Sequence, residues 1–240
     1  MSKLSDFIRW NHRPFCSAVV LAAGSSQRMG LDKMFADLSG IPVLARTLKA
    51  INGCRCIDEI VVVAGHDKIV EVARLCRNYG IIKATKVICG GQTRGESSLA
   101  GICEINPKAK LVAIHDGARP LVTEQVVYDA VHAAALYKCA APGIPVKDTV
   151  KIAEQNTVVE TPRRSGTIAI QTPQVFVPEL IDGAITHALE NNIEITDDCS
   201  AVEILGIPVH VTKGSEENIK LTTPLDMALA ETILKKRGDI

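Results

Sequence analysis

Two cations, Arg28 and Lys33, follow a loop of small residues and are well placed to bind an anion. The loop begins at Gly24, directly after residues 18–23, a continuous apolar run typical of a strand buried on both faces of a parallel sheet. In open α/β sheets ligands bind where the strands end, and glycine and serine leave backbone N–H groups accessible to a phosphate. The stretch therefore predicts a phosphate-binding loop, with a plain tight turn as the alternative.

A second polar group follows another apolar run, residues 111–115, in the sequence HDGARP. Asp116 comes directly after this run, and Arg119 follows three residues later. A carboxylate beside an arginine at a strand end is suited to holding a divalent cation next to a phosphate. A simple surface ion pair between Asp116 and Arg119 is the alternative, and His115 is expected to pack or to form hydrogen bonds.

The sequence GGQTRGESSLAG, residues 90–101, again places glycines and hydroxyls between an expected strand and helix. Backbone groups and Ser97 could contact a base and a ribose there. A helix whose cap lies near Ser97 or Ser98 is the alternative.

The first loop, which begins at Gly24, lacks both the third glycine of GxGxxG and the GK[ST] ending, which disfavours hydride transfer and kinase chemistry.

Apolar spacing predicts the elements that position these loops. Pro42 suits the first helical position (N1) of a helix whose apolar residues follow over 43–51, and Thr123 suits the N-cap of a long helix. Further strands are expected at 59–64 and 86–89, with a helix over 69–76 between them. Because crossovers between parallel strands are right-handed, the pattern predicts an α/β fold with a doubly wound, mostly parallel sheet.

Residues 146–170 depart from this pattern. DTVKIA and TVVET are expected to form two short strands around the polar residues 154–156. A two-stranded hairpin is marginal alone. We therefore expect this protruding β-hairpin arm to need a partner surface.

Composition limits the possible partners and compartments. The 240 residues carry no net charge, which favours neither nucleic acid nor an acidic membrane surface. No apolar run reaches the length of a membrane span or a signal-peptide core, so a cytoplasmic protein is expected. The eight cysteines are scattered and expected to be reduced, and the CxC pair of Cys54 and Cys56 lacks the other ligands of a zinc site. One domain over residues 1–240 is expected, with residues 1–16 as an N-terminal extension.

Seven ordered motifs resemble those of the 2-C-methyl-D-erythritol 4-phosphate cytidylyltransferase family. They are AAGSSQRMG, GGQTRGESSLAG, AIHDGARP, APGIPVKDTVK, TPRRSGTIAIQTPQVF, ITDDCSAVEILG and GSEENIKLTTPLDMALAE, spread over residues 18–231. The resemblance implies a Rossmann-like nucleotidyltransferase fold, transfer of CMP from CTP to a methylerythritol phosphate, a Mg²⁺ cofactor and a homodimer joined by the hairpin arm. A ribitol 5-phosphate cytidylyltransferase and a non-catalytic nucleotide-binding regulator remain as alternatives.

The resemblance also implies roles for particular residues. Arg28 and Lys33 would stabilise charge on the α-phosphate, Arg164 and Lys220 would position the sugar phosphate, and Asp116 would hold Mg²⁺. The CTP contacts would be Ala22, Ala23, Gly24, Gly91, Gln92 and Ser97. The sugar-phosphate side would comprise Arg119, Asp148, Thr149, Arg164 and Thr172, with Thr149 and Arg164 reaching the neighbouring subunit's site.

The implied reaction explains why no catalytic triad is needed. A phosphomonoester has a second pKa near 6, so its oxygen is already ionised at pH 7 and requires no general base. Two departures from the family pattern stand out. The loop before Lys33 is short and reads LDKMF where PKQ is usual, and Gln92 stands where an aspartate is common.

Overall fold

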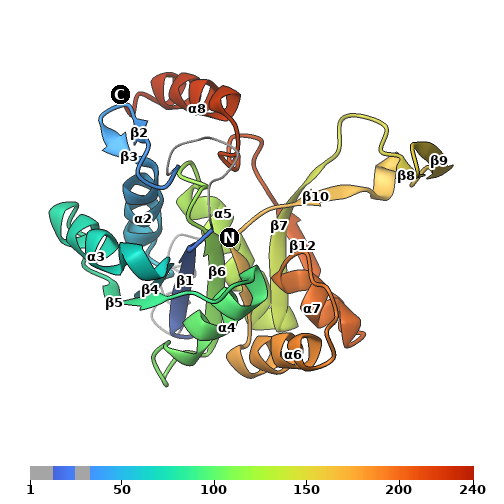
Figure 1. Cartoon of the computed structure of the whole chain (residues 1–240), viewed down its shortest axis with the longest axis horizontal. Helices are drawn as coiled ribbons and strands as arrows, with labels where there is room; N and C mark the ends of the chain where they lie inside the picture. The colour runs from blue at the N-terminus through green and yellow to red at the C-terminus, as the bar shows by residue number, and fades with distance from the viewer. Residues whose placement is uncertain (1–12, 25–32) are drawn as a thin grey trace, which may run out of the picture.

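The computed structural model describes residues 13–24 and 33–240 (Figure 1). An eight-stranded sheet forms its centre, in the order β10-β7-β11-β6-β1-β4-β5, with β12 pairing with β7. Its strands are β1 (Cys16–Ala22), β4 (Glu59–Ala64), β5 (Ala84–Cys89), β6 (Leu111–Asp116), β7 (Cys139–Pro145), β10 (Ile168–Ile170), β11 (Gln174–Phe176) and β12 (His210–Lys213). The pairs β1–β4, β1–β6, β4–β5 and β12–β7 are parallel, whereas β10 and β11 run antiparallel to their neighbours. The predicted doubly wound, mostly parallel sheet is confirmed.

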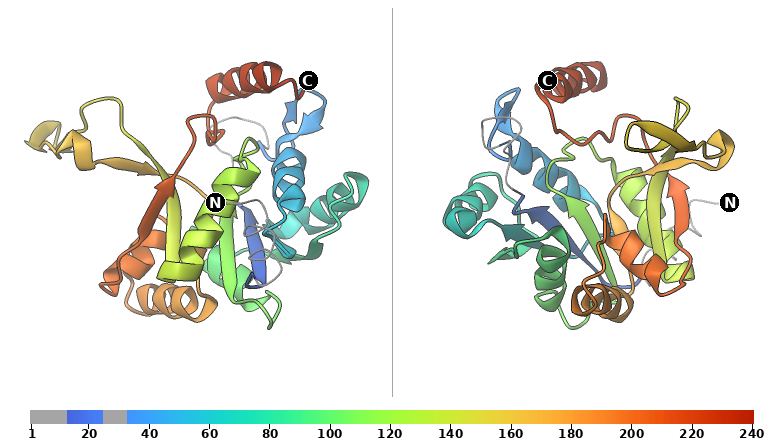
Figure 2. Two further views of the ribbon diagram at one scale, coloured as in Figure 1. Left: turned by 180° about the vertical axis from the view of Figure 1, so that it is seen from behind. Right: turned by 45° about the vertical axis from the view of Figure 1, so that its right-hand side comes forward.

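Strand β1 shows why its sequence is a continuous apolar run. Successive side chains of a strand point to opposite faces, and both faces of β1 are covered. Ala18 and Val20 belong to one apolar core, and Val19 and Leu21 belong to the other. Helices α2 (Val43–Gly53), α3 (Ile69–Asn78) and α5 (Glu124–Tyr137) cover the first face, while α4 (Arg94–Cys103), α6 (Pro178–Glu190) and α7 (Asp198–Ile204) cover the second (Figure 2).

The predicted start of α5 is confirmed, and the start of α2 differs from its prediction by one residue. Thr123 is the N-cap of α5 and accepts a hydrogen bond from the backbone N–H of Val126, as predicted. Pro42 was expected at the first helical position (N1) of α2 and is instead its N-cap, one position earlier. Helix α8 (Pro224–Arg237) packs with the small hairpin of β2 (Asp37–Leu38) and β3 (Ile41–Pro42) around a third apolar cluster.

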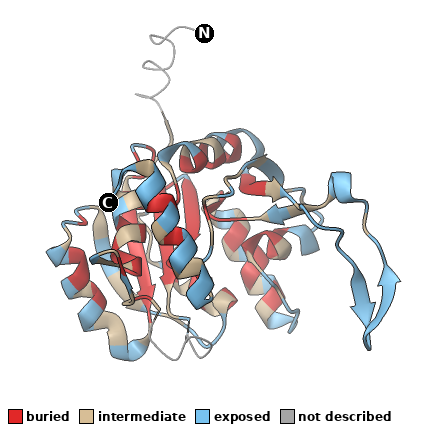
Figure 3. Cartoon of the chain, turned by 90° about the horizontal axis from the view of Figure 1, so that it is seen from above, coloured by how far each residue is buried: buried red, intermediate tan, exposed pale blue. Residues whose placement is uncertain are grey.

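The predicted hairpin arm is confirmed as a structural element. It comprises β8 (Ile152–Glu154) and β9 (Thr157–Glu160), and Gln155 and Asn156 turn between them with φ angles of 47° and 65°. The arm extends away from the sheet, and its strands are exposed on all sides (Figure 3). The short 3-10 turn at Arg164–Gly166 then leads into β10.

Part of the expected N-terminal extension is packed against the rest of the chain. Residues 1–12 of the expected extension lie outside the described residues, while Arg13 forms a bidentate ion pair with Asp58 and so belongs to the packed structure. All eight cysteines are free, and burial raises the pKa of Cys54 to about 12 and that of Cys56 to about 11, so both thiols stay protonated at neutral pH. No helix in the described part of the chain is both long and apolar enough to cross a membrane.

Candidate active site

A pocket of about 520 Å³ opens where β1 and β6 end and α4 begins. The carboxyl ends of these neighbouring parallel strands bring together loops that are far apart in the chain. Predicted site residues that line this pocket are Ala23, Gly24, Lys33, Gly91, Gln92, Ser97, Asp116 and Lys220. The two glycine-rich loops and the acidic strand end therefore form one site.

Asp116 is the carboxylate around which the cations of this site gather. Its Oδ2 lies 3.1 Å from Nζ of Lys220 and 3.3 Å from Nε of Arg119, and its Oδ1 lies 3.7 Å from Nη2 of Arg94. Burial raises the pKa of the Asp116 carboxyl, but Lys220, Arg94 and Arg119 outweigh this effect and lower the pKa to about 2. Asp116 is therefore ionised at neutral pH. The ion pair with Arg119 is present, but it is not the simple surface pair of the alternative interpretation, since Asp116 is only 8% exposed.

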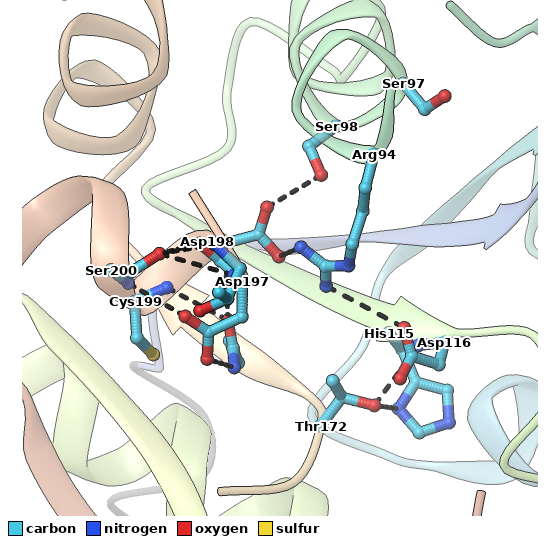
Figure 4. Close-up of polar contacts among 12 residues, drawn as sticks. Arg94, Ser97, Ser98, His115, Asp116, Thr172, Asp197, Asp198, Cys199 and Ser200 are labelled. Atoms are coloured by element: carbon cyan, nitrogen blue, oxygen red, sulfur yellow. Dashed lines mark hydrogen bonds and ion pairs between the residues drawn. The ribbon is translucent and has the colours of Figure 1, made fainter. Parts of the chain in front are cut away.

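A chain of hydrogen bonds fixes Asp116 from behind (Figure 4). The backbone N–H of Asp116 donates to Oγ1 of Thr172, and the Thr172 hydroxyl lies 3.0 Å from Nδ1 of His115. Nε2 of His115 faces the carbonyl of Arg119 at 3.2 Å, so this nitrogen must carry the proton. Burial lowers the pKa of His115 to about 4, which keeps the imidazole neutral. His115 is thus a hydrogen-bonding histidine, as expected.

The loop before α8 supplies Lys220 and is itself tied to the sheet. Asn218 is wholly buried, donates from Nδ2 to the carbonyl of Thr172, and accepts a hydrogen bond from Nη1 of Arg119 at its own carbonyl. The backbone N–H of Leu221 donates to the carbonyl of Ala118. These contacts hold Lys220 beside Asp116.

Two glycines permit the second loop to close tightly on α4. A Cβ on Gly91 would lie 2.3 Å from Cβ of Glu96, and a Cβ on Gly90 would lie 2.6 Å from that of Ala23. Glu96 uses the space by accepting hydrogen bonds from the backbone N–H groups of Gln92 and Thr93. The N-cap of α4 is Thr93 rather than Ser97 or Ser98, which lie buried in the first turns.

Arg94 is a site residue that the sequence reasoning missed, although it lies inside a quoted motif. It lines the pocket, and its Nη1 lies 2.7 Å from Oδ2 of Asp198, a carboxylate that is wholly buried. An arginine in the first turn of a helix opposes the helix dipole. Such a position was a signal that an acidic partner lies nearby, but the sequence does not indicate which one.

Other predicted residues lie outside the pocket lining. Arg119 contacts the carboxylate of Asp116, and Thr172 accepts a hydrogen bond from the backbone N–H of Asp116. Ala22 ends β1 next to the pocket. Asp148, Thr149 and Arg164 are exposed on the arm and are not among the residues that line the pocket. Arg28 lies outside the described residues.

The donor set around Asp116 fits a magnesium ion that shares its ligands with a substrate. No group of three or more histidine, cysteine, aspartate or glutamate side chains converges in the described ranges. Mg²⁺ is commonly held by one or two carboxylates together with substrate phosphates and water, rather than by a protein cage. Oδ1 of Asp116 has no hydrogen-bond donor within reach among the described residues, so it is the oxygen available to a cation.

Solved structures share the fold of this chain. The 4-diphosphocytidyl-2C-methyl-D-erythritol synthase of Anaerococcus prevotii aligns with a TM-score of 0.82 and 31% identity over 92% of this chain and 96% of that one. The 2-C-methyl-D-erythritol 4-phosphate cytidylyltransferase of Thermus thermophilus aligns with a TM-score of 0.73 and 28% identity over 90% of this chain and 98% of that one. The fold and the pocket at its strand ends define an α/β nucleotidyltransferase.

Sequence comparisons identify the family. Residues 16–236 match the family model of 2-C-methyl-D-erythritol 4-phosphate cytidylyltransferase. The enzyme of that name from Caldanaerobacter subterraneus is 43% identical over 92% of this chain and 99% of its own length, and the one from Halalkalibacterium halodurans is 42% identical over 92% and 97%. The chain belongs to the 2-C-methyl-D-erythritol 4-phosphate cytidylyltransferase family.

Proposed function

We propose that this protein transfers CMP from CTP to 2-C-methyl-D-erythritol 4-phosphate, giving 4-diphosphocytidyl-2-C-methyl-D-erythritol and pyrophosphate in the non-mevalonate route to isoprenoid precursors. The observation that carries this proposal is the cation-rich pocket. Lys33, Lys220 and Arg94 line it together with Asp116, beside two glycine-rich loops. Family membership supplies the choice of nucleotide and acceptor.

The proposed roles follow the positions of the residues. Gly91, Gln92 and Ser97 lie on the α4 side of the pocket and would contact the nucleoside of CTP. Lys33 would face the α-phosphate, where developing negative charge requires a fixed cation, and Lys220 would position the sugar phosphate. The backbone of Ala22, Ala23 and Gly24 would approach the nucleotide at the end of β1.

Within the proposed reaction, the protein brings two anions together instead of generating a nucleophile. The acceptor phosphate is ionised at neutral pH and needs no base. His115 is neutral, and both of its ring nitrogens already have partners, so it is not available to remove a proton. Bound Mg²⁺ would neutralise charge on the phosphates of CTP, with Asp116 as its protein ligand. Arg119 and Lys220 hold the Asp116 carboxylate in place for that role.

We also propose that the active form is a homodimer in which the arms are exchanged. On the arm, Val158 and Val159 are more than half exposed, at 53% and 54%, which is unfavourable for an apolar strand in water. Arg164 and Thr149 are exposed on the same segment and do not line the pocket of their own chain. In the exchanged dimer, Arg164 and Thr149 would contact the substrate bound in the pocket of the other subunit.

Incubation with CTP, Mg²⁺ and a sugar phosphate tests the proposed reaction. We expect pyrophosphate release with 2-C-methyl-D-erythritol 4-phosphate and little with ribitol 5-phosphate. The Asp116→Asn variant provides the background rate. Preference for ribitol 5-phosphate would reassign the acceptor, while no release with either acceptor would favour a non-catalytic nucleotide-binding protein.

A further inference from the structure

The carboxylate of Asp198 is buried, and the proposed reaction assigns no role to it. It is the first residue of α7 and is 0% exposed. Its Oδ1 accepts a hydrogen bond of 2.7 Å from Oγ of Ser98, and its backbone N–H donates to Oε1 of Gln174 on β11. Its position is therefore fixed from α4 and from the sheet at once.

Arg94 lies between this buried carboxylate and Asp116 (Figure 4). Nη1 of Arg94 is 2.7 Å from Oδ2 of Asp198, in a close ion pair. Nη2 is 3.7 Å from Oδ1 of Asp116, which is beyond hydrogen-bond distance. The guanidinium is thus drawn to one carboxylate and stops short of the other.

The two oxygens of Asp116 consequently differ. Oδ2 contacts both Lys220 and Arg119, whereas Oδ1 faces only Arg94 within the described part of the chain. Arginine forms short, two-pronged contacts with carboxylates when nothing restrains it. A restraint on Arg94 is therefore needed for Oδ1 to stay uncovered.

We propose that Asp198 is a positioning residue that holds Arg94 away from Asp116 and thereby keeps Oδ1 of Asp116 open to a divalent cation. The inference rests on the proposed function, in which Asp116 is a ligand of Mg²⁺. Asp198 acts through charge because it is buried, where water does little to weaken its attraction for Arg94. It also partly neutralises Arg94, whose positive charge would otherwise repel an incoming cation.

A purely structural role for Asp198 makes a different prediction. Asp198 begins α7 next to the N-cap residue Asp197, so its replacement could simply loosen the helix. In that case the effect would not depend on the presence of Arg94. The double variant Asp198→Asn with Arg94→Gln separates the two roles, since it removes both charges and leaves neither one buried without a partner.

Binding of Mn²⁺, a paramagnetic substitute for Mg²⁺, provides a readout other than activity. Free Mn²⁺ is measured by electron paramagnetic resonance in the presence of saturating α,β-methylene-CTP, which cannot react. We expect Asp198→Asn to raise the Mn²⁺ dissociation constant about tenfold, because Arg94 then closes onto Asp116, and the double variant to return to near the wild-type value. Asp197→Asn is the matched control, since it changes the neighbouring carboxylate and the cap of α7 without a direct contact to Arg94.

Equal Mn²⁺ affinity in the wild type and in Asp198→Asn would overturn the proposal, as would a loss that persists in the double variant. Equal affinity in the wild type and in Asp116→Asn would overturn the metal assignment itself and this inference with it. The pyrophosphate assay on the wild type tests the proposed function separately. A crystal structure of Asp198→Asn is expected to show Nη2 of Arg94 within hydrogen-bond distance of Oδ1 of Asp116, and an unmoved Arg94 would contradict the proposal.

Discussion

The side chains of the pocket are buried and paired, whereas those of the arm are exposed. In the pocket, Asp116 is 8% exposed and has three cations around it, each drawn from a different segment of the chain. On the arm, every residue of β8 and β9 is exposed, and the cross-strand contact of Lys151 with Thr161 lies at the surface. The described residues of one chain complete the charge pairs of the pocket, whereas none of them covers the strands of the arm.

The two regions also differ in the sequence separation of the contacts that hold them. The pocket is held by long-range contacts, such as Asn218 to Thr172, that exist only in the folded chain. The arm is a local hairpin that can form from its own turn but gains stability only against another surface. We therefore expect changes in the pocket to reduce chemistry and changes in the arm to reduce association.

The largest effect is expected for Lys33→Ala, which should lower turnover about 10³-fold, because a cation that stabilises developing charge acts mainly on the transition state. The affinity for CTP should change far less. Steady-state rates together with nucleotide binding measure the two effects. Lys108→Ala, a change at an exposed lysine in a loop, is the control. Unchanged turnover in Lys33→Ala would remove this residue from the proposed mechanism.

A second change in the pocket links charge to stability. Because the folded-state pKa of Asp116 is lowered to about 2, the ionised carboxylate stabilises the fold above about pH 4, and this contribution is lost as the pH falls toward 2. In metal-free buffer, Asp116→Asn should be less stable than the wild type by about 2 kcal/mol at pH 6, with the difference shrinking below pH 4. Urea unfolding at each pH measures it. A constant difference would show that the charge of Asp116 is not the cause.

On the arm, replacement of Val158 and Val159 by serine should weaken the proposed dimer about tenfold or more, since apolar area at an interface would be lost. Turnover at high protein concentration should be largely retained. Sedimentation velocity over a dilution series provides the dissociation constant. Val70→Ser, at a valine on α3 that is 61% exposed, is the control. The same dimer affinity in all three proteins would exclude the arm from the interface.

The smallest effect concerns the cap of α4. Thr93→Ala should lower the free energy of unfolding by about 1 kcal/mol, because the backbone N–H of Glu96 loses the Thr93 hydroxyl as its acceptor. Thr93→Ser keeps that oxygen and should retain most of the stability. Thermal unfolding of both variants measures the difference. Equal loss in the two would mean that the hydroxyl contributes little.

Local patterns predicted much of the fold. Strand β4 covers the predicted residues 59–64, and the hairpin turn lies within the predicted residues 154–156. The position of β11 between β6 and β7 was not predicted, because this strand has only three residues and pairs with segments far away in the chain. Its antiparallel direction makes the sheet mixed instead of fully parallel.

The site was predicted where its residues lie in recognisable loops and missed where they depend on tertiary pairing. Asp116 and Lys220, both named from the sequence, line one pocket, and their proposed roles stay predictions; the buried state of Asp116 was not foreseen. Asp198 was missed because its charge partner, Arg94, is distant in sequence, and an acidic residue at a helix start is ordinarily explained by capping. Only the packing of α7 against α6 and the sheet brings these two residues together.

A mixed dimer tests most directly whether one active site takes its pocket from one chain and its arm from the other. Chains carrying Asp116→Asn and chains carrying Arg164→Met, each expected to be inactive alone, are combined and the heterodimer is purified with two different affinity tags. If the arms are exchanged, one of its two sites receives both wild-type residues, and the heterodimer should show about half of the wild-type activity per dimer. If each arm serves its own chain, both sites remain defective, and activity no higher than that of the parent variants would contradict the account.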